Sequence, residues 1–333
     1  MLTSNRGLSL VELIITMFIV LLVLGGAYLT YTNLLKGFKR ESISIETEME
    51  KLVGSELIRL DLEHAGYGVG RDESRPPVEW YSSIPKLIIR STLNNTNQKT
   101  FGWLLIKCES AGNLLKDSVV IDKRYDKNNK YIIILDAKKK VISTSSFLKL
   151  DDTITCPKKG IFAAFPIDMN VINHSGSGCI NQYCHLIEYR LSSSNNLGDC
   201  NPGTRNLLRN NKPVIDCVSD FKIRYGIDTD GDGLIDKYDT QSFYDTNSDG
   251  ILDKSSSFTD LNGNGSVDTR DLRKSLKLIT VYLLMQEGKY DPEYTFNNST
   301  GYIEVDGIKL NLPANYQHYR WKVLKITVKP MNL

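Results

Sequence analysis

Aspartate and asparagine recur at regular intervals between residues 228 and 271. In the first interval, side chains that carry oxygen occupy positions 1, 3, 5, 9 and 12 of a loop, and glycine occupies position 6. Ca²⁺ takes about six to eight oxygen ligands, and a glycine at position 6 permits the sharp turn that directs them inward. With the backbone carbonyl of position 7 included, the predicted ligands are Asp228, Asp230, Asp232, Leu234, Asp236 and Asp239.

Two further copies of this pattern follow, and they begin 17 and 15 residues after the copy before them. The second is the weakest predicted site, because its position-12 residue is Ser256, which replaces a carboxylate poorly. The predicted ligands are Asp245, Asn247, Asp249, Ile251 and Asp253 in the second copy, and Asp260, Asn262, Asn264, Ser266, Asp268 and Asp271 in the third.

A disordered acidic linker is the alternative interpretation of residues 228–271. The segment has eleven aspartates against three basic residues, a net charge of −8, which leaves about +10 for the rest of the chain. A linker does not explain the repeated glycine, or the apolar pair that follows it in the first two copies. The loops resemble dockerin and thrombospondin type 3 repeats, and none has the position-12 glutamate of sensor EF-hands. The resemblance implies structural calcium, which would order an otherwise self-repelling insert.

Another group of residues with unusual spacing lies near the N-terminus. An uncharged apolar run, residues 13–35, directly follows Glu12 and is long enough to cross a bilayer as a helix. A signal peptide or a plain signal anchor is the simpler interpretation. No small-residue cleavage site follows the run, however, and neither alternative explains an acid at the membrane edge, where an ionised carboxylate is costly.

The sequence Arg6-Gly7-Leu8-Ser9-Leu10-Val11-Glu12 resembles the class III signal of type IV prepilins. The resemblance implies that a membrane prepilin peptidase cuts between Gly7 and Leu8, removes the leader 1–7, and leaves a methylated N-terminus. It also implies that Glu12 of an incoming subunit pairs with the terminal amine of a neighbouring pilin, which makes the buried charge tolerable. The helix would remain as a single inner-membrane anchor with a periplasmic head, until the subunit enters a pilus at the cell surface.

The membrane helix is predicted to continue to about residue 66, so that the whole N-terminal helix covers 8–66. Gly66 and the glycines after it suit the end of a helix. Apolar side chains recur at three- and four-residue steps and form a stripe of Ile45, Met49, Leu52, Val53, Leu57 and Leu60. We expect this stripe to pack on the head, and a partner-binding face is the alternative.

Six cysteines follow the anchor, and an even number in an exported chain indicates disulfides. Cys179 with Cys184 and Cys200 with Cys217 would close local loops, which leaves Cys108 with Cys156. A zinc site is the alternative, although its spacing is not that of a zinc finger. Its ligands would be His174, Cys179, Cys184 and His185.

Residues 67–333 are predicted to form a β-rich head, since short apolar or β-branched runs alternate with turn residues. Two polar stretches, 173–184 and 192–213, are predicted as long loops. The basic run Lys138–Lys140 is interpreted as a solvated surface rather than a nucleic-acid patch. The predicted strands are 86–90, 100–108, 118–121, 131–135, 184–191, 218–225, 278–285 and 319–328, the last with Leu324, Ile326 and Val328 facing inward and Lys325 and Lys329 outward.

Three stretches resemble PilW-like minor prepilins: Leu60–Tyr67 at the end of the first helix, Val218–Asp228 in the head, and the final strand Tyr319–Val328. The resemblance implies an α+β fold with a long pilin helix on a β-rich head, here with the calcium repeat inserted. It implies a minor type IV pilin of the initiation or tip complex, whose partners are other pilins. The alternatives are a minor pseudopilin of a type II secretion system and a pilus-associated adhesin or DNA-uptake subunit. No phosphate loop or catalytic group of residues stands out, so we expect no enzyme.

Overall fold

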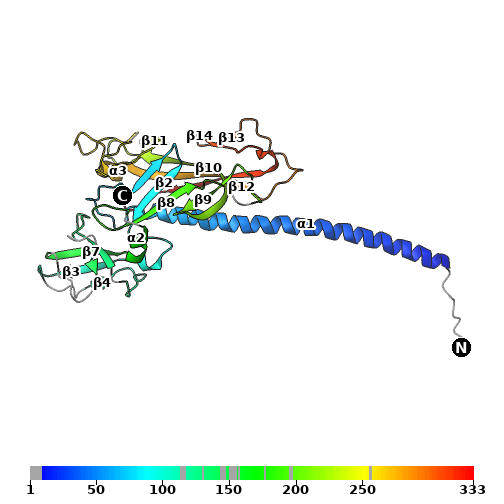
Figure 1. Cartoon of the computed structure of the whole chain (residues 1–333), viewed down its shortest axis with the longest axis horizontal. Coiled ribbons are helices and arrows are strands. Elements are labelled where there is room, and N and C mark those ends of the chain that lie inside the picture. Colours follow the sequence, from blue (N-terminus) through cyan, green and yellow to red (C-terminus); the bar gives the residue numbers. More distant parts are fainter. Residues whose placement is uncertain are drawn as a thin grey trace, which may run out of the picture. The chain divides into compact units, whose positions relative to one another are not determined.

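The computed structural model describes residues 10–112, 118–129, 131–142, 148–149, 156, 158–175, 178–194, 198–254 and 257–333. The chain divides into two compact units, Met1–Met49 and Glu50–Leu333. Helix α1 (Leu10–Glu63) begins in the first unit and ends in the second, and β-strands dominate the remainder of the chain (Figure 1). A long helix and a β-rich head together confirm the predicted α+β fold. The predicted cleavage residues Gly7 and Leu8 lie outside the described residues.

The first part of α1 has the length and composition of a membrane span. Residues Leu10–Leu35 reach a mean hydropathy of 2.6 with all their side chains outside any protein core, as a helix surrounded by lipid requires. Glu12 lies in the first turn of α1, at the start of this span. The structure therefore puts one acidic group at the edge of an otherwise apolar 26-residue segment.

The last part of α1 packs on the head through a face that differs from the predicted stripe. Leu52 and Val53 are 69% and 68% exposed, whereas Gly54, Ile58 and Leu62 are buried. The apolar pattern does not predict this face, because one residue of the face, Gly54, has no apolar side chain. A Cβ atom at position 54 would overlap the side chain of Ile215, so only glycine permits this close approach of helix and sheet.

The larger sheet of the head has eight strands in the order β1-β2-β8-β9-β10-β12-β15, with β11 paired to β10. Every described pair in it is antiparallel. Ile58 and Leu62 of α1 join the core that covers this sheet. The strands are β1 (Val78–Tyr81), β2 (Lys86–Ser91), β8 (His185–Leu191), β9 (Arg205–Arg209), β10 (Lys212–Ile227), β11 (Lys237–Asp239), β12 (Leu276–Glu287) and β15 (Arg320–Val328).

A second, five-stranded sheet has the order β4-β3-β7-β5-β6 and a core of its own. Helix α2 (Met169–Ser175) packs on one end of it, and the short helix η1 (Gln98–Thr100) precedes its first strand. A separate hairpin of β13 (Tyr302–Val305) and β14 (Ile308–Asn311) forms a third cluster with β12 and β15, and η2 (Tyr316–His318) precedes β15. The five strands of the second sheet are β3 (Leu104–Cys108), β4 (Ser118–Val120), β5 (Tyr131–Leu135), β6 (Leu148–Lys149) and β7 (Gly160–Pro166).

All six cysteines form disulfides, and the pairing is the predicted one. The Cα–Cα distances are 5.6 Å for Cys108–Cys156, 5.6 Å for Cys179–Cys184 and 5.4 Å for Cys200–Cys217. The alternative zinc site is therefore wrong, because two of its four ligands are bonded to each other. Cys108 and Cys156 lie in the core of the second sheet, where their bridge joins the chain on both sides of that core.

Most predicted strands are confirmed, and β5 has the predicted bounds, Tyr131–Leu135. On β15, Ile326 and Val328 are buried and Lys325 and Lys329 are exposed, as the alternation predicts. One prediction of a long loop is wrong, because residues 192–213 contain β9 and the start of β10. The stretch 173–184 begins inside α2, but its described remainder, 178–184, contains no helix or strand, as predicted. Both stretches contain polar residues that are buried through polar partners, which a hydrophobic pattern does not detect.

Candidate metal centre

The acidic segment is an insertion between two neighbouring strands of the larger sheet. Strand β10 ends at Ile227, which pairs with Leu276 at the start of β12. The amide of Asp228 donates to the carbonyl of Ser275 across a distance of 2.9 Å, so the insertion leaves and re-enters the sheet at adjacent points. Helix α3 (Thr269–Ser275) is its last element. The sheet therefore holds both ends of the insertion in fixed positions.

The first loop is wound around the carboxylate of Asp228. This carboxylate accepts hydrogen bonds from the amides of Gly231 at 2.5 Å and Gly233 at 2.8 Å. Asp236 closes the loop by accepting from the amide of Thr229 at 2.7 Å and from its hydroxyl at 2.8 Å. The winding brings carboxylates from both ends of the loop to the same side.

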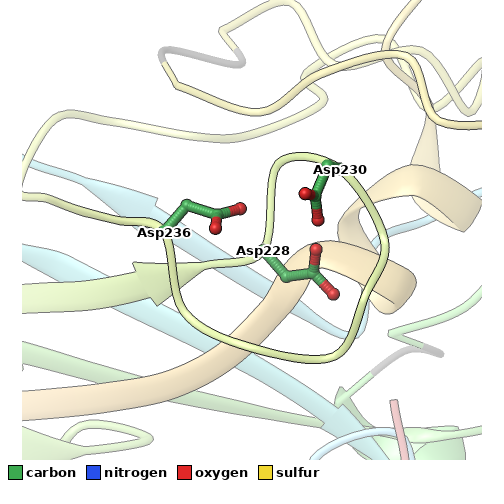
Figure 2. A group of neighbouring side chains, drawn as sticks. All are labelled: Asp228, Asp230 and Asp236. Atoms are coloured by element: carbon green, nitrogen blue, oxygen red, sulfur yellow. The ribbon is translucent and has the colours of Figure 1, made fainter.

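Three carboxylates converge as a result. One oxygen atom from each of Asp228, Asp230 and Asp236 lies within 4.8 Å of the other two (Figure 2). Lys277 provides the nearest cation, with its Nζ atom 3.3 Å from Oδ2 of Asp228. Oxygen atoms from several carboxylates on one flexible loop are the donor set that Ca²⁺ prefers, so the residues present fit this ion.

The pKa values of this group favour the ionised form. Burial raises the pKa of Asp228, but the amides of Gly233 and Gly231 and the charge of Lys277 outweigh that effect and hold the pKa below its ordinary value. Hydrogen bonds from Thr229 likewise lower the pKa of Asp236. Both carboxylates are therefore charged at neutral pH, and they repel each other. A bound cation would reduce this repulsion.

The second and third loops repeat the winding of the first. The position-1 carboxylate of each accepts from the amides at positions 4 and 6: Asp245 from Ser248 and Gly250, and Asp260 from Gly263 and Gly265. The position-6 glycines have φ values of +94°, +91° and +89° in the three loops. Such angles favour glycine, which is the physical reason for its recurrence.

The second and third loops also contact each other. The amide of Leu252 donates to the carbonyl of Val267 at 2.9 Å, and Ile251 forms a β-bridge with Asp268. Leu252 belongs to the main core and Val267 packs against it. The corresponding residue of the first loop, Ile235, is half-buried against Gly226. The apolar residue after position 7 thus anchors each loop to the head.

Position 12 of the first loop lies apart from the group of three carboxylates. Asp239 lies in β11, outside the group of three carboxylates, and accepts hydrogen bonds from the amide of Thr240 at 2.6 Å and from the hydroxyl of Ser257. In the third loop, Asp271 accepts from the amides of Leu261 and Asn262 at 3.1 Å each. Asp271 therefore binds the backbone of its own loop, whereas Asp239 stabilises a turn.

The remaining predicted ligands occupy the expected loop positions. Side-chain oxygens at positions 3 and 5 accept from the amide two residues later, which orients Asp230, Asp232, Asn247, Asp249, Asn262 and Asn264. At position 9, Asp253 binds Thr246, and Asp268 accepts from the side-chain amides of Asn262 and Asn264. The position-7 residues are Leu234, Ile251 and Ser266, and Ser256 lies outside the described residues.

Sequence reasoning missed two polar residues, Thr229 and Thr246. Each occupies position 2 of its loop and binds the position-9 carboxylate through both its amide and its hydroxyl. The recurrence of threonine at position 2 was the available signal. Lys277 was also missed, because its contact with Asp228 depends on the pairing of β10 and β12 rather than on local sequence.

Comparisons with known proteins give two family matches. Residues 189–332 match the model of a family described as type IV pilus-assembly protein W, and residues 2–28 match the prokaryotic N-terminal methylation motif. No curated protein matches the chain. Among solved structures, the chain is similar to a type IV-like pilin from Thermus thermophilus, with a TM-score of 0.36 and 9% identity over 86% of this chain and 97% of that one.

Proposed function

The chain is a PilW-like minor prepilin of type IV pilus assembly, and from this premise we propose that it acts in the low-copy complex that initiates the pilus or forms its tip. The main support for the proposal is that the methylation motif, residues 2–28, overlaps the exposed apolar part of α1. A helix that is apolar on all sides needs either lipid or other helices around it. The proposed partners are therefore other pilins, after processing by prepilin peptidase in the inner membrane.

The assembly role centres on Glu12, in the first turn of α1. We expect its carboxylate to pair with the N-terminal amine of a neighbouring subunit, since an unpaired charge at that depth is costly. The variant Glu12→Val should insert into the membrane and lose its leader, but should be absent from sheared pili. Glu109→Val, which removes an exposed acid of the head, is the matched control. Normal incorporation of Glu12→Val would contradict this role.

The position at the tip is supported by the size of the head and by the insertion on it. A shaft subunit must repeat along the filament, whereas a subunit with a large and irregular head is easier to accommodate once, at the end. Deletion should reduce the number of pili, and immunogold labelling should find the head at filament ends. Labelling along the whole shaft would contradict the tip position, and a secretion defect with normal pili would favour the type II pseudopilus.

The head is proposed to bind structural calcium through the three loops. Support comes from the convergence of Asp228, Asp230 and Asp236 and from the same winding in all three copies. Calcium should raise the Tm of the full-length protein, and a chelator should lower it, because binding to the folded state alone stabilises that state. Asp228→Asn should reduce the calcium-dependent shift, whereas Asp199→Asn, outside the loops, should not. No shift and no bound ion would refute calcium binding.

A further inference from the structure

A cleft of about 1210 Å³ lies in the head, beside the second and third acidic loops. One wall comes from these loops, at Asp249 and Asn264, and another from the turn after β5, at Lys138 and Lys140. The two walls are joined by the segment 70–74. The amide of Arg71 donates to the carbonyl of Lys139 at 2.8 Å. Thr269 of α3 donates through its hydroxyl to the carbonyl of Ser74 at 2.7 Å.

The lining carries more positive than negative charge. Seven basic and four acidic side chains line the cleft. Only two of the basic ones form an ion pair within the described part of the chain: Arg270 with Asp268 at 2.6 Å, and Lys277 with Asp228 at 3.3 Å. The other five, which have no acidic partner there, are Arg71, Lys138, Lys140, Arg273 and Lys274.

The acidic residues beside them bind the protein backbone instead. Both oxygens of Glu73 accept from amides, those of Ile180 and Asn181, at 2.8 Å each. Asp72 accepts from the amide of Val141 at 3.1 Å. These carboxylates hold the segment 70–74 in place and do not pair with the cations that line the cleft. The lining as a whole therefore keeps an excess of positive charge that a ligand can neutralise.

Arg273 is the most informative of the lining residues. Its side chain is only 8% exposed, yet it forms no ion pair among the described residues, and its Nε atom has no hydrogen-bond partner there. Its guanidinium donates to the carbonyls of Val69 and Gly70, the latter at 3.1 Å. A guanidinium taken out of water without an ion-pair partner is unfavourable for the folded head.

Neighbouring cations make this buried site still less favourable for the charged guanidinium of Arg273. After desolvation, the charges of Arg71 and Arg273 are the causes that lower the pKa of Lys139. Like charges placed so close together destabilise a folded protein unless anions offset them, and at Arg273 the nearby charges of Glu73 and Asp72 offset part of the repulsion. A buried, unpaired arginine at the base of a cationic cleft is therefore more consistent with ligand binding than with a role in stability.

We propose that this cleft binds an acidic peptide segment of a partner protein, with Arg273 at its base and Lys138 and Lys140 at its rim. The volume exceeds that of ordinary small-molecule pockets, about 300–1,000 Å³. Carboxylates match the fork of donors on a guanidinium. No aromatic side chain lines the cleft in the described part of the chain, so it lacks the stacking surface that single-stranded nucleic acid uses. Neither the pilus assignment nor calcium binding is needed for this proposal.

The test uses the full-length protein in detergent micelles and a fluorescent peptide of eight glutamates. Fluorescence anisotropy should show saturable binding. The pair Lys138→Gln and Lys140→Gln should raise the Kd about five- to tenfold, through loss of two rim contacts. The matched control pair, Lys123→Gln and Lys127→Gln, removes the same charge from exposed positions outside the cleft and should leave the Kd unchanged. Absence of binding, or equal weakening by both pairs, would overturn the proposal.

A second variant separates binding from folding. Arg273→Met should weaken peptide binding at least tenfold without lowering the Tm, because it removes an unpaired buried charge while keeping most of the side-chain volume. A structural role for Arg273 makes the opposite prediction, a lower Tm with an unchanged Kd, and that result would refute the assignment. Tighter binding of a single-stranded oligonucleotide of equal charge than of the peptide would also refute it, in favour of a nucleic-acid site.

Discussion

Arg209 and Asp61 form a buried ion pair in which Nε lies 2.7 Å from Oδ2, and the side chains are 6% and 0% exposed. Tyr189 donates to the same Oδ2 atom at 2.5 Å, and Asn95 donates to Oδ1 at 2.8 Å. Asp61 lies near the end of α1, within the stretch Leu60–Tyr67 that resembles PilW-like proteins, whereas Tyr189 and Arg209 lie on β8 and β9. One carboxylate therefore joins the end of the long helix to two strands.

Removing the charge of Asp61 should destabilise the head strongly. Asp61→Asn would leave Arg209 buried without its counter-ion, and breaking one partner of a buried pair costs about 3–5 kcal/mol. Urea unfolding of the full-length protein in detergent measures the loss. Glu56→Gln is the matched control, because it breaks the exposed pair with Arg59 on the same helix and should lower the free energy of unfolding far less. Equal effects of the two variants would show that the buried pair is not important for stability.

The close contact between α1 and the sheet at Gly54 makes a second prediction. A Cβ atom there would lie 2.5 Å from the carbonyl oxygen of Val214 as well as against Ile215, and neither backbone nor core can move freely. Gly54→Ala should therefore lower the free energy of unfolding by about 1–3 kcal/mol, although alanine favours helix. Gly198→Ala is the control, since no atom of the described residues beyond its chain neighbours lies within 4 Å of the added Cβ. A stabilised Gly54→Ala variant would contradict this packing.

These two contacts also show what the sequence alone could predict. Strand β5 was predicted to the residue because its five side chains are apolar or aromatic and all lie in or against a core. Strand β9, with the sequence Arg-Asn-Leu-Leu-Arg, has the composition of a polar loop. Arg209 is buried through partners distant in the sequence, Asp61 at 148 residues and Asn94 at 115. The packing face of α1 was missed for the same reason: Gly54 and Asp61 belong to it through partners that are distant in sequence.

In the candidate metal loops, too, some features could be predicted from the local sequence and others could not. The spacing is enough to predict the local winding of each loop, because glycine at position 6 and oxygen at positions 1, 3, 5 and 9 determine it. The contact between Leu252 and Val267, the Lys277–Asp228 pair and the turn that holds Asp239 depend on how strands and loops meet. Local patterns contain no information on such contacts.

His185 makes the stability of the head depend on pH. Burial lowers its pKa from 6.5 to about 4, and its Nε2 atom has no partner in the described part of the chain. In the unfolded chain this histidine takes up a proton below about pH 6.5, whereas the folded protein resists protonation until about pH 4. The contribution of neutral, buried His185 to the free energy of unfolding is therefore fully present above about pH 6.5, and it is lost as the pH falls toward 4.

The size of this effect is set by the pKa shift, and it amounts to about 3 kcal/mol between pH 7 and pH 4. His185→Leu should remove that part of the pH dependence, because leucine binds no proton in either state. Urea unfolding of both proteins at pH 7 and pH 4 measures the difference. If the variant loses as much stability on acidification as the wild type, other groups are responsible for the pH dependence.

The backbone hydrogen bond between Leu252 and Val267 leads to a prediction about calcium, and this prediction rests on the proposed metal binding. Because the second and third loops share a backbone hydrogen bond, ordering one by an ion should help to order the other. Among the described residues, the first loop forms no backbone hydrogen bond with the other two loops and only side-chain links to Ser257 and Thr259, so we expect it to bind independently. Isothermal titration of the full-length protein should then show one independent ion and a cooperative pair.

Asp228→Asn should remove only the independent ion. Asp260→Asn should abolish the cooperativity and weaken the second loop, whose position-12 residue is already a poor ligand. Two unchanged, independent sites in Asp260→Asn would refute the coupling while leaving calcium binding intact.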